Sequence, residues 1–117
     1  YYFLKQFKMP YLYLLLAILC EITGTILLPA SQNFTKILPT IVLSLSYILA
    51  FYFLTFAMKN IPIAIVYATW SGLGVFCISI LSYVIYSQTL QWQSILGLFL
   101  IVTGVIIVNT FASNTIN

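Results

Sequence analysis

The sequence predicts an all-α integral membrane protein with four transmembrane helices joined by short loops. Of its 117 residues, 63% are hydrophobic and only 4% are charged, whereas soluble domains carry about 25% charged residues. The hydrophobic residues form four runs separated by short polar stretches. Each run has roughly the 20 residues that span a hydrocarbon core. A chain of this composition cannot cover a water-facing surface, so we expect it to lie within a bilayer.

The first two runs end at helix breakers. The first covers residues 10–28 and is followed by Pro29, which cannot continue the hydrogen bonding of a helix normally. The second covers residues 37–58 and ends at the polar KNIP stretch. We therefore expect the first helix to stop before Pro29 and the second to stop before Lys59.

The last two runs complete the predicted bundle. The third covers residues 62–86, and Pro62 suits the first turn of a helix because its missing N–H is not needed there. The fourth covers residues 94–112 and is followed by a short polar tail. Because the connections are short, each helix is expected to lie antiparallel to the next.

The chain is expected to contain one four-helix transmembrane domain, residues 9–117. Met9 is a plausible natural start, so residues 1–8 are interpreted as an N-terminal extension or a remnant of expression. The four runs leave no segment for a separate soluble domain. Any activity is therefore expected to take place in the membrane.

Charged side chains are few, and this excludes several classes of function. They are Lys5, Lys8, Glu21, Lys36 and Lys59, with no Asp, Arg or His. A nucleic-acid site needs a clustered basic face, which four scattered lysines do not supply. Enzyme and metal sites need acids, histidines or cysteines in groups, and the chain offers one acid and two isolated cysteines. We therefore predict no catalytic residues, no metal and no cofactor.

The single acid, Glu21, lies in the middle of the first apolar run. An ionised carboxylate at the bilayer centre costs about 2.5–3.5 kcal/mol, so an intramembrane acid indicates function by default. No lysine lies within a run to neutralise it, so its partner when ionised is expected to be a cation from outside. A carboxylate that holds either a proton or a cation is the minimum requirement of an antiporter. Glu21 is therefore the predicted proton- and substrate-binding residue.

Other interpretations of Glu21 are open at this point. A protonated carboxyl could hydrogen-bond to a neighbouring helix and serve packing alone. A proton-conducting rotor subunit also uses one buried carboxylate, although such subunits are typically two-helix hairpins. A structural subunit or assembly factor would not need the acid. Because four short helices enclose little volume, the transporter interpretation requires at least a dimer.

Aromatic residues are expected to complete the cation site. In the third run, Tyr67, Trp70, Ser71 and Gly74 recur at three- and four-residue spacing and so share one helical face. Trp normally prefers the membrane interface, so a Trp in mid-span favours a lined cavity. Aromatic faces attract organic cations by roughly 0.5–2 kcal/mol each. The predicted aromatic ligands are Tyr11, Tyr47, Tyr67 and Trp70.

We expect the glycines of the last two runs to allow helix bending and close helix packing. Gly72 and Gly74 remove side-chain bulk from the third helix and could let it bend. Gly97 and Gly104 lie seven residues apart on one face of the fourth helix. Small residues allow membrane helices to approach closely, so this face is expected to contact another helix.

Three stretches resemble the small multidrug resistance transporters: PYLYLLLAILCEITGT, IPIAIVYATWSGLGVF and GLFLIVTGV. The resemblance covers residues 10–112, and the Glu-x-x-Gly-Thr and Ala-x-Trp-Ser-Gly-x-Gly motifs are specific. It implies an antiparallel, dual-topology homodimer in the bacterial inner membrane that exchanges protons for drug cations by alternating access. Organic cations, protons as coupling ions and the lipid bilayer are then the expected partners.

The resemblance also implies roles for individual residues. The family's essential membrane glutamate falls on Glu21, and Thr25 and Ser71 lie in the same two motifs and are predicted to bind substrate. Its binding-site aromatics fall on Tyr11, Tyr47, Tyr67 and Trp70. Its hinge glycines fall on Gly72 and Gly74, and its dimer contact falls on Gly97 and Gly104.

One position indicates the branch of the family. The guanidinium-exporting branch usually carries a Trp three residues after the glutamate, where this chain has Gly24 followed by Thr25. A smaller residue leaves room for a bulkier guest, so we expect quaternary ammonium and aromatic cationic drugs as substrates. Guanidinium or polyamine export, a heterodimer with a paralogue, and a non-transporting structural role are the alternatives.

The chain departs from the family pattern in two loops. Relatives usually have a Lys just after the first helix, where this chain has Pro29. They also usually have charges in the third loop, where this chain has the uncharged SQTLQ. Both departures concern loop electrostatics and leave the Glu21 site unchanged.

Overall fold

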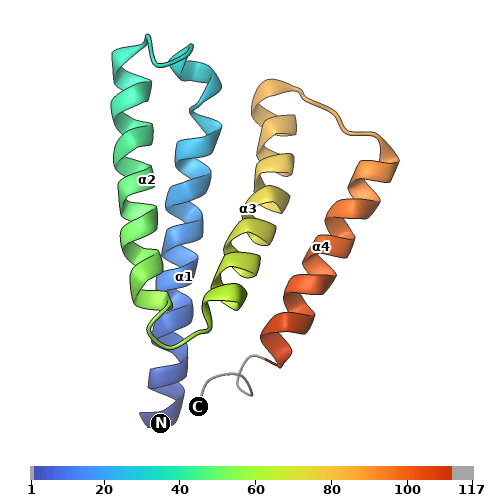
Figure 1. The fold of residues 1–117 in the computed structure, drawn as a ribbon. Coiled ribbons are helices and arrows are strands. Elements are labelled where there is room, and N and C mark those ends of the chain that lie inside the picture. Colours follow the sequence, from blue (N-terminus) through green and yellow to red (C-terminus); the bar gives the residue numbers. More distant parts are fainter. Residues whose placement is uncertain (1, 112–117) are drawn as a thin grey trace.

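The computed structural model describes residues 2–111, and the side chains of residues 9–111. This part of the chain forms four long helices and contains no strand (Figure 1). The helices are α1 (Tyr2–Ile26), α2 (Ile37–Ala57), α3 (Ile63–Tyr86) and α4 (Trp92–Thr110), and a short 3-10 helix, η1 (Pro29–Ser31), follows α1. All four long helices are long and apolar enough to cross a membrane. The predicted all-α, four-span fold is therefore confirmed.

Some helix ends differ from the predicted runs. α1 begins at Tyr2 rather than at Pro10, because one interior proline removes a single hydrogen bond and no other helix breaker precedes it. It ends at Ile26, so that Pro29 opens η1 instead of following the helix directly. Pro62 precedes α3 as its cap residue, with an extended ψ of 143°.

Two predicted boundaries are not tested by these helices. Residue 112 and the polar tail lie outside the described residues. The backbone of α1 runs without interruption through residues 2–8, whose origin as an extension or a remnant of expression stays a prediction.

α1 is the central helix of the chain. It packs extensively against α2 and also against α3, whereas α4 packs mainly against α3 at the edge of the molecule (Figure 1). Apolar residues of α1 recur every three to four positions and so form one buried stripe. The core built on this stripe consists of Leu14, Ala17, Ile18, Ile22, Leu54, Ala57, Ile61, Ile65 and Val66. α1 is thereby held from two sides.

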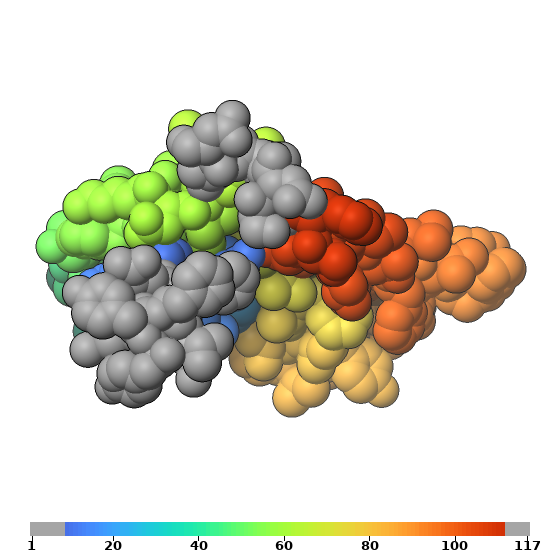
Figure 2. All heavy atoms as spheres, turned by 90° about the horizontal axis from the view of Figure 1, so that it is seen from below, coloured from blue at the N-terminus to red at the C-terminus, as the bar shows by residue number. Residues whose placement is uncertain are grey.

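The outer helix α4 buries much less of its surface. Only 6% of its span is buried inside the chain, compared with 33% for the span of α1. Seen along the bundle, α4 forms one flank of the molecule, and α2 lies on the other side (Figure 2). Val105 is the buried residue of α4. Most of the α4 surface is therefore open to lipid or to a second protein.

Tyr86, at the end of α3, closes one end of the bundle. Its hydroxyl donates a 2.6 Å hydrogen bond to the carbonyl oxygen of Ile26, the last residue of α1. The last four carbonyl groups of a helix have no partner within the helix itself. Tyr86 therefore satisfies one of these groups and ties the end of α3 to the end of α1.

Candidate functional site

Glu21 lies half-buried in α1, beside a cavity of about 220 Å³ between α1 and α3. The cavity is lined by Glu21 and Thr25 from α1 and by Trp70, Ser71, Gly74, Val75 and Ile78 from α3. The first five of these were predicted to belong to the functional site. Two motifs that are far apart in the sequence therefore meet at one cavity.

The carboxylate of Glu21 ends a chain of hydrogen bonds. Thr25 Oγ1 donates to Glu21 Oε1 at 2.6 Å, and the same Oγ1 lies 2.6 Å from the hydroxyl oxygen of Tyr47 on α2. A threonine hydroxyl has one hydrogen to donate. Because Thr25 directs it at Glu21, Tyr47 must be the donor to Thr25. The chain from Tyr47 through Thr25 therefore ends on one oxygen of the Glu21 carboxylate and fixes its orientation.

Gly74 makes room for the other carboxylate oxygen. A Cβ at this position would lie 3.1 Å from Glu21 Oε2, which is closer than ordinary van der Waals contact. A side chain at position 74 would therefore require the carboxylate to shift by a few tenths of an ångström. Gly74 thus has a role in seating Glu21, while its predicted role as a hinge stays a prediction.

Trp70 lies between two other aromatic rings. Its ring centroid is 6.0 Å from that of Phe51 on α2 and 5.9 Å from that of Tyr67 on α3. Trp70 Nε1 is buried and has no hydrogen-bond partner within the described residues. A buried N–H without a partner is unusual, and this one belongs to a residue of the cavity wall.

Gly24 allows α2 to approach α1 closely. A Cβ at Gly24 would lie 3.2 Å from ring atoms of Tyr47 and 3.3 Å from the carbonyl oxygen of Leu43. The absence of a side chain therefore lets the Tyr47 ring lie over α1, where its hydroxyl reaches Thr25. Gly24 supports the site from outside the cavity.

Three of the four predicted aromatic ligands do not line the cavity, and of these Tyr47 reaches it only through its hydrogen bond with Thr25. The Tyr11 hydroxyl donates to Asn109 Oδ1 on α4 at 3.0 Å. Tyr67 is 63% exposed on the surface of α3 and contacts Trp70 edge-on. Ser71 does line the cavity, but its hydroxyl donates to the Tyr67 carbonyl on its own helix. Within one chain the aromatic part of the site is therefore incomplete.

The sequence interpretation missed two residues of this region. Phe51 packs against Trp70, but its run contains many aromatic residues and offered no reason to choose it. Asn109 hydrogen-bonds to Tyr11, and an amide within an apolar run was the available signal for such a contact.

The four predicted structural glycines have different surroundings. Gly72 lies against α4, since a Cβ there would be only 2.6 Å from Val105 Cγ2. Nothing lies within 4 Å of a Cβ placed at Gly97 or Gly104. The stripe on α4 is therefore open within one chain, and Gly72 contributes to the contact between α3 and α4.

Metal-binding side chains do not cluster in the described part of the chain. It contains no group of three or more His, Cys, Asp or Glu residues that could hold an ion. Cys20 and Cys77 are free and half-buried.

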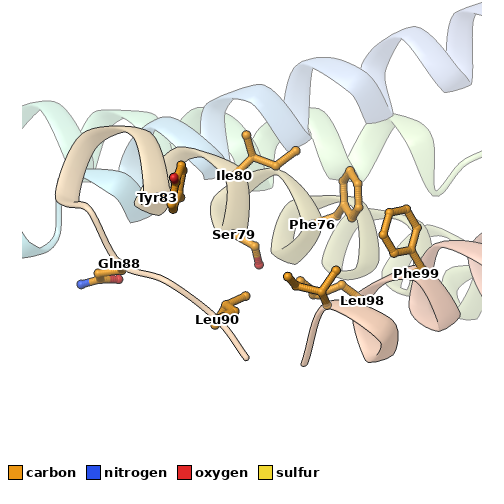
Figure 3. A pocket seen from close by; sticks show the side chains of 9 residues that line it. Phe76, Ser79, Ile80, Tyr83, Gln88, Leu90, Leu98 and Phe99 are labelled. Atoms are coloured by element: carbon orange, nitrogen blue, oxygen red, sulfur yellow. The ribbon is translucent and has the colours of Figure 1, made fainter. Parts of the chain in front are cut away.

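A second hollow lies between α3 and α4 and has different chemistry. It measures about 340 Å³ and opens between the second half of α3 and the first half of α4 (Figure 3). It is lined by Phe76, Ser79, Ile80, Tyr83, Gln88, Leu90, Ile95, Leu98 and Phe99. None of these residues is charged, so the smaller cavity beside Glu21 is the candidate site for a cation.

Known proteins resemble this chain over most of its length. The family model described as Small Multidrug Resistance protein matches residues 9–101. The chain is 42% identical to the quaternary ammonium compound-resistance protein QacH of Staphylococcus saprophyticus, over 91% of this chain and 99% of QacH. It is 40% identical to the quaternary ammonium compound-resistance protein QacE of Escherichia coli, over 85% of this chain and 90% of QacE. It is also 40% identical to the multidrug transporter EmrE of Escherichia coli strain K12, over 91% of this chain and 96% of EmrE.

Proposed function

Because the chain belongs to the Small Multidrug Resistance family, we propose that it exports hydrophobic organic cations in exchange for protons. Membership of the family makes it a drug-efflux transporter rather than an enzyme, and a multi-pass protein of the bacterial inner membrane. The exchange of protons and the residues that perform it are our proposal. One observation carries it: the only acid in the chain, Glu21, lies at the wall of a cavity and accepts a hydrogen bond from Thr25.

Glu21 is proposed as the common binding site of the proton and the cation. In its ionised form it accepts from Thr25, and a hydrogen bond to a charged acceptor is roughly twice as strong as one between neutral groups. The negative charge attracts a cation into the cavity, and a proton on the same carboxylate removes that attraction. Binding of one therefore requires release of the other. Protons are the coupling ion, and the exchange needs no further cofactor.

Hydrophobic and aromatic cations are the proposed substrates. The ring of Trp70 lines the cavity, and the rings of Phe51 and Tyr67 pack against Trp70. Aromatic faces attract organic cations without requiring one hydrogen-bond geometry, so several cations of different shape can bind. QacH and QacE are named for resistance to quaternary ammonium compounds, and we extend this class of substrate to the present chain.

Gly24 supports this class of substrate over guanidinium. A Cβ at this position would already press on the Tyr47 ring at 3.2 Å. A Trp at position 24 would therefore displace Tyr47 and break the hydrogen bond that Tyr47 makes with Thr25. The site around Glu21 thus depends on a small residue where the guanidinium-exporting branch is expected to carry a large one.

The proposed functional unit is an antiparallel homodimer that works by alternating access, with Gly72 and Gly74 as hinge residues. The open stripe at Gly97 and Gly104 supports close approach of a second copy. Lysines in short loops set the orientation of a membrane protein. In residues 9–111 the two loop lysines, Lys36 and Lys59, lie at opposite ends of α2. This balance favours insertion in both orientations, and a heterodimer with an oppositely oriented paralogue is the alternative assembly.

Binding of tetraphenylphosphonium to the purified protein, from about pH 5 to about pH 9, tests the exchange. In the pH range where Glu21 is protonated, the affinity for tetraphenylphosphonium should fall about tenfold, or about 1.4 kcal/mol, for each unit by which the pH is lowered. Glu21→Gln should bind weakly and without pH dependence. Glu21→Asp, which keeps a carboxylate, is the matched control and should retain the dependence. An affinity that stays constant over the whole range in the unsubstituted protein would contradict proton exchange.

A further inference from the structure

The side chain of Asn109 joins three helices at a distance from the cavity. Its Nδ2 donates to Thr69 Oγ1 on α3 at 2.7 Å and to the Val105 carbonyl on α4 at 2.8 Å. Its Oδ1 accepts from the hydroxyl of Tyr11 on α1 at 3.0 Å. Both amide hydrogens are therefore used, and these partners fix the orientation of the Asn109 amide.

The α3 partner of Asn109 is held tightly. Thr69 is only 5% exposed, and a buried hydroxyl that loses its partner is costly in free energy. One helical turn before Asn109, Val105 packs into the space left by Gly72, where a Cβ would be 2.6 Å from Val105 Cγ2. α4 therefore contacts α3 at two positions, through a hydrogen bond at Thr69 and through close packing at Gly72.

These two positions flank, in the sequence, two residues of the candidate cation site. Trp70 and Ser71, which line the Glu21 cavity, lie between Thr69 and Gly72 in the sequence. Asn109 itself is not part of the cavity lining. The bond to Thr69 connects Asn109 to the cavity through the segment of α3 that follows Thr69.

We propose that Asn109 is a positioning residue for Trp70. By binding Thr69, it fixes the rotation of this segment of α3 relative to α4, and so holds the Trp70 ring at the cavity. The use of this ring in transport rests on the proposed function, whereas its placement by Asn109 can be measured without a ligand. Asn109→Leu and Thr69→Val each remove the hydrogen bond while keeping nearly the same side-chain volume.

Fluorescence of Trp70 tests the placement directly. The chain has two tryptophans, Trp70 and the exposed Trp92, so Trp92→Phe leaves Trp70 as the single indole. In this background, Asn109→Leu and Thr69→Val should both shift the emission maximum of Trp70 and change its quenching by brominated lipid. The double variant should match Asn109→Leu, because the bond that Thr69→Val removes is already absent there.

Thr110→Val is the matched control for these variants. Thr110 follows Asn109 on α4, and its hydroxyl donates to the Ile106 carbonyl within the same helix. The control should leave Trp70 emission unchanged. Unchanged emission in both Asn109→Leu and Thr69→Val, or an equal shift in Thr110→Val, would overturn the proposal.

Cation binding shows whether the placement affects the site. In the otherwise unsubstituted protein, Asn109→Leu should weaken tetraphenylphosphonium binding about fivefold and tetramethylammonium binding less than about twofold, because the aromatic contact is affected most. The pH dependence should not change, since Glu21 is intact. Equal losses for both cations would contradict a role through Trp70. If emission shifts as expected but even the unsubstituted protein binds neither cation, the proposed function fails while the positioning of Trp70 stands.

Discussion

α1 and α4 are both apolar helices of membrane-spanning length, but the chain uses them in opposite ways. α1 is packed between α2 and α3, and a third of its span, 33%, is buried. α4 is packed mainly on α3, and 6% of its span is buried. The acid and its hydrogen-bond partner Thr25 lie on α1, whereas the open glycine stripe lies on α4.

On the proposed function, the difference follows from what each helix has to do. A binding residue needs fixed surroundings, and Glu21 has them because Thr25, Tyr47 and Gly74 define the position of its carboxylate. An assembly surface has to stay uncovered until the second copy binds. On this proposal the carboxylate is held in place on one side of the bundle, and the other side is left for a second copy.

Loss of the acid on α1 should have the largest effect. Glu21→Gln is expected to abolish export of a labelled cation from membrane vesicles under an imposed pH gradient. The protein should still fold, because a neutral amide costs less to bury than a charge. Gradient-driven export at the unsubstituted rate would show that α1 does not carry the coupling.

A bulky residue on the open stripe of α4 should affect association and leave the single chain intact. A Cβ at position 104 meets nothing within 4 Å, so the chain itself leaves open space where the side chain of Gly104→Leu begins. It is expected to weaken dimerisation at least about tenfold, or about 1.4 kcal/mol, as measured by energy transfer between labelled copies. Thr103→Leu, at the exposed neighbouring position, is the control and should dimerise normally. Normal dimerisation of Gly104→Leu would locate the interface elsewhere.

The hydrogen-bond partner of Glu21 offers a matched pair of variants on α1. Thr25→Val removes the donor to Glu21 and should weaken cation binding about tenfold, because hydrogen bonds to charged groups contribute about 1.5–3 kcal/mol. Thr23→Val removes a hydroxyl that bonds only to the Leu19 carbonyl of its own helix and should leave binding unchanged. Titration of both proteins at one pH above neutrality measures the difference. Equal affinities would mean that Thr25 plays no part in the site.

Substitution of the two tryptophans compares the candidate site with the outer helix, and its expected effect on cation binding is the smallest. Trp70→Ala should weaken binding of aromatic cations about fivefold more than binding of small aliphatic ones, since the cation–π attraction is lost while the charge of Glu21 remains. Trp92→Ala, on the exposed start of α4, should change neither. Calorimetric titration with one cation of each kind measures both effects. A Trp70→Ala protein that loses both cations equally would make Trp70 a packing residue.

The fold was predictable because the local amino-acid composition is enough to identify a membrane span. Each of the four helices corresponds to an apolar run bounded by polar or proline-containing stretches. The first and last residues of the helices were less predictable, as both ends of α1 show. Pro10 did not prevent a helix from extending back to Tyr2, and α1 stopped at Ile26, before Pro29 was reached.

Parts of the site that depend on local spacing were also predictable. Glu21 and Thr25 lie one turn apart on α1, so any helix brings them together. The pairing of Tyr11 with Asn109 joins residues that are 98 positions apart, and it depends on the tilt and rotation of two helices. The same holds for Gly72, whose contact with Val105 depends on how α4 sits against α3. Hydrophobic periodicity gives the buried face of a helix but not its partner.

The contact between Tyr86 and Ile26 has a consequence for how this sequence can vary. The acceptor is a main-chain oxygen, which every amino acid carries, while the donor is a phenol. Position 26 can therefore change among apolar residues without loss of the bond, but Tyr86→Phe removes it. In a saturation library of this chain, position 26 should tolerate many residues and position 86 should retain tyrosine. One hydrogen bond thus places its entire evolutionary constraint on one of its two residues.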